Sequence, residues 1–86
     1  MVLIEEHPDG PRTTLVLSGR IESSDVQQLR LEMDRIETAV ALELRQVRIV
    51  DRDAVRFLAR CEKEGIELLD CPLFVRAWMQ SEQNSK

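Results

Sequence analysis

Residues 40–61 read "VALELRQVRIVDRDAVRFLARC" and decide the fold of the chain. The first half is rich in Val, Leu and Ile, which is typical of a core strand. The second half repeats apolar residues at helical spacing, which indicates a helix with one buried face. The charged segment "DRD", residues 51–53, separates the two halves. It is either the polar start of a helix or a functional site, and the rest of the chain bears on that choice.

The beginning of the chain is predicted to form a hairpin. Residues 2–4 and 12–19 are rich in apolar and β-branched residues, which favours strands. The segment "HPDGP", residues 7–11, lies between them and is a strong turn signal, because Pro fixes φ and Gly permits positive φ. Gly19 is expected to end the second strand.

A helix is predicted for "ESSDVQQLRLEMDRIE", residues 22–37. Ser23 or Ser24 is the expected N-cap, since Ser is among the preferred residues there. Asp25 suits the positive end of the helix dipole. Leu31 lies off the apolar stripe of this helix and is expected to be exposed.

The remaining pattern completes an alternation of strands and helices. Residues 40–50 form a core strand, the helix after "DRD" ends at Gly65, residues 66–69 form a short strand, and residues 73–80 form a third helix. Strands separated by helices imply parallel neighbours joined by right-handed crossovers. The chain is therefore predicted to have an α/β fold with a four-stranded mixed, mostly parallel sheet and helices largely on one face.

Length and composition bound the class of protein. The chain has 86 residues, enough for one small domain, which we place at residues 1–80 with a flexible polar tail at 81–86. Its net charge of −4 and its three aromatic residues (two Phe and one Trp) argue against nucleic-acid binding. No apolar run approaches the length of a transmembrane helix, and the start of the chain is unlike a signal peptide. We therefore expect a cytoplasmic protein with no membrane insertion.

The residues that carry catalysis or bind metals are sparse. Cys61 and Cys71 lack the close-spaced partners of a zinc site, and His7 lies far away in sequence. Two free, largely buried thiols are expected. The sequence has no Gly-rich phosphate loop and no metal-ligand spacing. We therefore expect no cofactor, no metal and no enzyme activity.

Two segments, "LVLSGRIESSDVQQLRLEMDRI" and "VALELRQVRIVDRDAVRFLARCEKEGIELLDCP", resemble the STAS domain. The features that carry the resemblance are a strand ending in "LSGRI", a core strand with "LEL", and an aspartate that opens the next helix. The resemblance covers residues 2–79. The STAS family comprises bacterial anti-sigma-factor antagonists and the cytoplasmic tails of sulfate transporters. The resemblance implies a STAS-like fold and a regulatory protein that acts by binding other proteins.

The resemblance also implies a function for the "DRD" segment. Regulatory members of the family carry Asp-Ser-Ser/Thr-Gly there, and a partner kinase that is also the anti-sigma factor phosphorylates the first serine. In this chain Asp51 matches the aspartate, Arg52 takes the place of that serine, Asp53 the next position and Ala54 the glycine. Arginine cannot accept this phosphate. The usual serine switch is therefore expected to be absent.

The charged junction also has purely structural explanations. Asp51 is a good N-cap, and Asp53 suits the first helical turn. Arg52 is less easily explained, because a cation is disfavoured at a helix N-terminus, and it is a candidate partner contact. Ser23 and Ser24 are alternative phosphoacceptors if they are not caps. The predicted partner-binding residues are Ser23, Ser24, Asp51, Arg52, Asp53, Ala54, Arg56 and Arg60.

Two functions remain open at the level of sequence. The first is a non-enzymatic regulator of transcription, similar to anti-sigma-factor antagonists, that binds an anti-sigma factor or serine kinase. In that case Asp53 either mimics a phosphorylated state or leaves binding constitutive. The alternative is a scaffold or sensory module that forms a homodimer or binds within a larger signalling or transport assembly.

Overall fold

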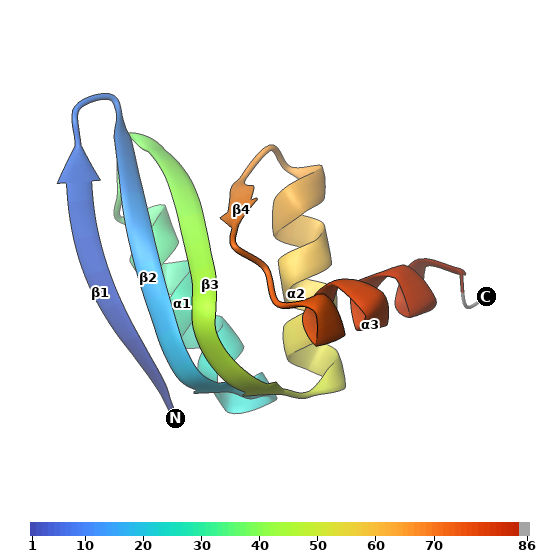
Figure 1. Ribbon diagram of the computed structural model, residues 1–86. Helices are drawn as coiled ribbons and strands as arrows, with labels where there is room; N and C mark the ends of the chain where they lie inside the picture. Colours follow the sequence, from blue (N-terminus) through green and yellow to red (C-terminus); the bar gives the residue numbers. More distant parts are fainter. Residues whose placement is uncertain (85–86) are drawn as a thin grey trace.

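The computed structural model describes residues 1–84. Its elements are β1 (Val2–Asp9), β2 (Arg12–Ile21), α1 (Ser23–Asp34), β3 (Ala39–Val50), α2 (Arg52–Lys63), β4 (Glu67–Leu69) and α3 (Leu73–Asn84). The strand order is β1-β2-β3-β4, with β1 antiparallel to β2 and the other two pairs parallel. Helices α1 and α2 lie behind the sheet in Figure 1, and α3 packs against α2 beyond β4. The predicted order and fold class are confirmed.

The core lies between the sheet and the two helices behind it. Alternate residues of β2 and β3 face the helices, and Leu15, Leu17, Leu42 and Leu44 are fully buried. Leu29 of α1 is also fully buried, whereas Leu31 is exposed as predicted. Burial of such side chains stabilises the fold by about 1.5–3 kcal/mol each. The helical and alternating spacings of the sequence therefore identify the core faces of β2, of α1 and of the first half of β3.

The hairpin is longer than the sequence indicates. His7 and Pro8 belong to β1, and the turn consists of Gly10 and Pro11 alone, with Gly10 at φ 62°. Pro8 is tolerated because β1 lies at the edge of the sheet, where a missing N–H on the free side breaks no strand pair. The prediction of a turn at residues 7–11 is therefore too wide.

Gly19 does not end β2, which continues to Ile21. The strand instead shifts register against β3 at two points, between Val16 and Ser18 and between Gly19 and Arg20. Gly19 adopts φ 90° there, a conformation that favours glycine. After the second shift Arg20 pairs with Ile49, which is 49% exposed rather than part of the core.

The ends of α2 and α3 differ in how well the sequence predicts them. Gly65 closes α2 at φ 95°, as expected, and its N–H donates to the Glu62 carbonyl, while the Ile66 N–H donates to that of Cys61. Helix α3, however, continues to Asn84, so residues 81–84 of the predicted tail are helical. Residues 85–86 of that tail lie outside the described residues.

Candidate functional site

The candidate site lies where two parallel strands end side by side. Ile21 at the end of β2 pairs with Val50 at the end of β3. Helix α1 begins immediately after the first strand and α2 immediately after the second. Two helix N-termini therefore meet at the carboxyl edge of the sheet, which is where α/β proteins commonly place binding sites.

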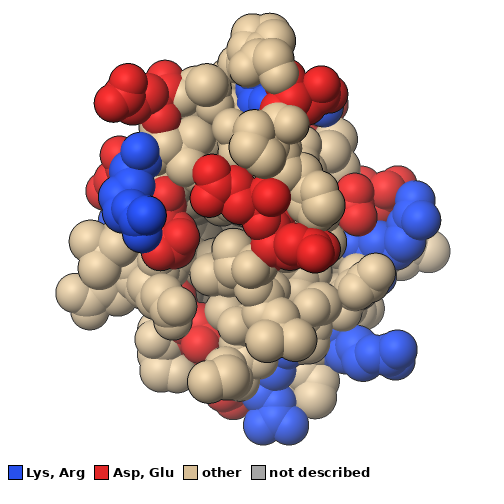
Figure 2. Space-filling model, turned by 90° about the vertical axis from the view of Figure 1, so that its left-hand side faces the viewer, with Lys and Arg blue, Asp and Glu red and all other residues tan. Residues whose placement is uncertain are grey.

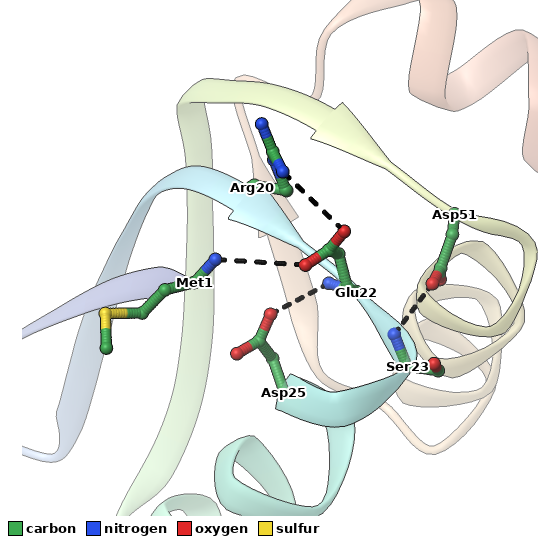
Figure 3. A network of polar contacts seen from close by, with 6 residues as sticks. All are labelled: Met1, Arg20, Glu22, Ser23, Asp25 and Asp51. Atoms are coloured by element: carbon green, nitrogen blue, oxygen red, sulfur yellow. Dashed lines mark hydrogen bonds and ion pairs between the residues drawn. The ribbon is translucent and has the colours of Figure 1, made fainter.

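Asp51 connects these two helix starts through its carboxylate. Its Oδ1 accepts a hydrogen bond from the Ala54 N–H at 2.9 Å, which makes it the N-cap of α2 as predicted. Its Oδ2 accepts a hydrogen bond at 2.8 Å from the backbone N–H of Ser23, which is the first residue of α1 (Figure 3). Each oxygen therefore satisfies a backbone donor of a different helix. This side chain has a structural function that joins elements separated by 28 positions in sequence.

The cap of α1 is Glu22, so the prediction of Ser23 or Ser24 is wrong. The Glu22 N–H donates to Oδ2 of Asp25 at 2.9 Å, and the Asp25 N–H donates to the Glu22 carbonyl at 2.8 Å. Asp25 is only 7% exposed and already supplies a carboxylate at this helix start. The two serines are consequently helical, and both are exposed.

Charged groups complete the polar network around Glu22. Its carboxylate lies 3.9 Å from the N-terminal amine of Met1 and 3.9 Å from a guanidinium nitrogen of Arg20. Figure 3 shows these groups on the side of Glu22 that faces away from Asp51. Pairs this long and this exposed contribute little stability. The hydrogen-bonded carboxylates of Asp25 and Asp51, rather than these ion pairs, order the edge.

We call the exposed residues in the first turns of α1 and α2 the helix-start surface: Ser23, Ser24, Arg52 and Asp53. Ala54, a predicted partner-binding residue, has no exposed area, because it is part of the core face of α2. It contributes only the backbone N–H that Asp51 accepts. The predicted residues at 23–24 and 51–53 are thus brought together, with Asp51 beneath the surface that the others form.

Two arginines of α2 that the sequence predicts as partner contacts, Arg52 and Arg56, lie beside a carboxylate of α3. Arg56 Nε donates to a carboxylate oxygen of Glu82 in α3 at 2.9 Å, and Arg52 Nε lies 3.7 Å from the other oxygen. The hydrogen bond from Arg56 is the main reason that the pKa of Glu82 lies below its usual range. Arg60 lines a groove of about 330 Å³ between α2 and α3. Sequence reasoning missed Glu82, because it placed residue 82 in a flexible tail.

The two thiols lie apart from this edge and are poorly suited to nucleophilic chemistry. Cys61 is 1% exposed, and burial raises its pKa to about 11. Burial also raises the pKa of the half-buried Cys71. Both thiols are therefore protonated at neutral pH, and a thiol reacts as the thiolate. His7 lies near the hairpin turn, at the opposite end of the sheet from Asp51.

Comparison of the structure with solved structures finds similar proteins, whereas comparison of the sequence does not. No protein-family model and no curated protein matches it. The anti-sigma-factor antagonist SpoIIAA in its unphosphorylated form is similar over 93% of this chain and 82% of its own, with TM-score 0.65 and 16% identity. A STAS-domain antisigma-factor antagonist from Rhodobacter sphaeroides is similar over 81% and 85%, with TM-score 0.58 and 19% identity.

A larger protein, Mglu, contains a similar unit. It matches 80% of this chain with TM-score 0.64 and 22% identity, but the chain spans only 19% of the length of Mglu. All three identities are low, so the likeness concerns the fold. The chain has a STAS-like fold, as its sequence resemblance implies. Among residues 1–84, no helix is long and apolar enough to cross a membrane.

Proposed function

We propose that the protein acts by binding a protein partner through the helix-start surface, and not as an enzyme. One observation carries this proposal: the Asp51 carboxylate accepts a backbone hydrogen bond from each of two helix starts. Those bonds hold Ser23, Ser24, Arg52 and Asp53 next to one another before any partner arrives. A preorganised surface loses less conformational entropy on binding.

The class of partner follows from the fold by analogy. The STAS-like fold and the likeness to two anti-sigma-factor antagonists support an anti-sigma factor or serine kinase as partner. The protein would then be part of a cytoplasmic signalling pathway that regulates bacterial transcription. Arg52 and Asp53 present opposite charges next to each other, and such a pair favours a partner with complementary charges. Arginine is also enriched among residues that dominate binding energy.

The proposed binding is not switched by phosphorylation of residues 51–54. Arg52 stands where the related regulators carry a serine, and no residue of this segment bears a hydroxyl. A phosphate adds nearly two negative charges and would change a binding surface strongly. Without an acceptor, this segment keeps one charge state, and regulation has to come from the partner or from another site.

A non-enzymatic function is supported by the nucleophiles available. The Cys61 thiol is buried with a pKa of about 11, and the only histidine lies at the other end of the sheet. Neither residue can act on a substrate at the helix-start surface.

Affinity capture from the native cell extract, with ATP or ADP present, tests the proposal. The baits are the wild type, the Arg52→Ala/Asp53→Ala variant, and an Arg45→Ala/Asp70→Ala control. The control removes the same two residue types from an exposed ion pair 3.0 Å long outside the helix-start surface. We expect a kinase-like protein that the wild type and the control retain and the first variant loses.

Other outcomes of this capture have different meanings. Equal retention by all three baits, or self-association alone, contradicts the proposal and favours a scaffold or sensory module. Incubation of the captured partner with ATP then tests the missing switch. A phosphate detected by mass spectrometry within residues 51–54 contradicts that part of the proposal.

A further inference from the structure

The outer strand β1 leaves one side of the sheet open. It is the first strand in the order β1-β2-β3-β4 and, within residues 1–84, pairs with β2 alone. Alternate residues of such a strand direct their backbone N–H and C=O groups away from the neighbour. Since Asp9 and Arg12 flank a two-residue turn, the register assigns these free groups to Val2, Ile4 and Glu6. Pro8 has no N–H, so the edge available for pairing ends before it.

A groove runs beside this open edge, between β1 and α1. Its first part, about 260 Å³, is lined by Val2, Leu3, Ile4 and Glu6 of β1 and by Gln28 and Glu32 of α1. A second part, also about 260 Å³, shares Glu6 and Glu32 and continues toward Ile36 and Glu37. The groove therefore follows the edge strand, and its lining combines apolar residues of β1 with polar and charged ones. A strand added to β1 would lie over it.

The groove and the strand beside it are acidic. Glu5, Glu6 and Asp9 belong to β1, and Glu32 and Glu37 line the opposite side. The one cation in the lining of the two parts is Arg35, whose guanidinium already donates to Glu32 at 2.9 Å. Figure 2 shows this side of the molecule, with acidic side chains across its middle and basic ones toward its margins.

The negative charge of the groove and of β1 determines which kind of chain segment could pair with the open strand. The strand β1 contains no Lys or Arg, so a second copy paired with it brings no such cation to the acidic edge, and a two-fold axis at Glu5 or Glu6 places that carboxylate opposite its own copy. Like charges on directly opposed strands are destabilising. Acidic residues on an edge strand thus disfavour self-pairing and favour a segment of opposite charge.

We propose that β1 binds an extended basic segment of a partner protein, which adds to the sheet as a further strand. The backbone groups of Val2, Ile4 and Glu6 pair with the segment. Its Lys or Arg side chains contact Glu6 and Glu32 in the groove. In this mode of recognition, main-chain hydrogen bonds give affinity and alternate side chains give specificity. This surface differs from the helix-start surface, and the proposal does not depend on the function proposed above.

The probe for this proposal is a short synthetic peptide in which Lys or Arg alternates with Thr. Its binding to the full chain is followed by amide NMR shifts and by fluorescence anisotropy. We expect the largest shifts in residues 2–6 and around Glu32. We expect Glu6→Lys to weaken binding about fivefold, from the loss of one surface attraction and the gain of one repulsion. Glu64→Lys, the same charge change on an exposed residue at the end of α2, leaves the affinity unchanged.

A second peptide separates strand addition from charge attraction alone. It has the same sequence with every backbone amide methylated, so it keeps its charge but cannot donate to β1. Loss of binding by this peptide supports the proposal. Equal binding by both peptides, equal effects of the two charge reversals, or no binding of the first peptide overturns it. Dimerisation of the free chain that the first peptide abolishes also overturns it, because a second copy is then the occupant.

Discussion

Replacement of Asp51 by alanine is expected to destabilise the protein by about 2–3 kcal/mol. The lost N-cap bond to the Ala54 N–H is worth about 1 kcal/mol. The lost bond to the Ser23 N–H is a charged one near the surface and is worth about 1–2 kcal/mol. For a domain of this size such a loss lowers the melting temperature by roughly 10–20 °C. Urea unfolding followed by circular dichroism measures the change in the free energy of unfolding.

Two further variants separate the bonds from the charge. Asp51→Asn keeps an oxygen that accepts from the Ala54 N–H, but its amide NH2 faces the Ser23 N–H, so two donors meet. We expect this variant to lower the free energy of unfolding by about 1–2 kcal/mol. Asp53→Ala removes an acid from the first turn of the same helix, where it makes no hydrogen bond among the described residues, and costs about 0.3–1 kcal/mol. The reasoning is refuted if Asp51→Ala costs no more than Asp53→Ala, or if Asp51→Asn matches the wild type.

Three other changes have defined outcomes. Glu82→Gln weakens the contact with Arg56 and speeds amide exchange in the last turns of α3. In the wild type, the same increase in exchange begins as pH falls below 4.5 toward the lowered pKa of Glu82. Unchanged exchange in the variant or at low pH would contradict this function of Glu82. The free energy of unfolding falls between pH 9 and 11, by up to about 2–3 kcal/mol, because the Cys61 thiol ionises more readily in the unfolded chain. Cys61→Ala should remove most of this pH dependence. An unchanged pH dependence in the variant shows that Cys61 is not its cause. Gly65→Ala costs about 1 kcal/mol or more in urea unfolding because φ is 95°, and a neutral effect would be unexpected.

The fold was largely predictable because its signals are local. Apolar spacing in residues 40–61 defines one strand and one helix, and Gly65 marks the end of that helix. The errors arise where tertiary structure overrides local preference. Pro8 remains in a strand because that strand lies at an edge. Gly19 lies at a register shift instead of a strand end, and Ile49, just beyond that shift, is exposed.

The candidate site was predictable only in part. Asp51 was identified as an N-cap from its position before an apolar helical pattern, and the structure confirms it. Its bond to Ser23 depends on two helices starting side by side, which no local signal reveals. The sequence identifies Arg52 only as a candidate partner contact, because Glu82 lies 30 positions away in a polar segment that resembles a tail. Once α3 packs against α2, that segment becomes helical and its carboxylate lies beside two arginines.

Hydrogen exchange of the protein with its captured partner tests directly whether the partner binds the helix-start surface. Amide exchange is compared, residue by residue, between the free protein and the complex. We expect additional protection at residues 22–25 and 51–56, where α1 and α2 begin. Protection confined to other elements, with exchange at these two segments unchanged, would contradict it.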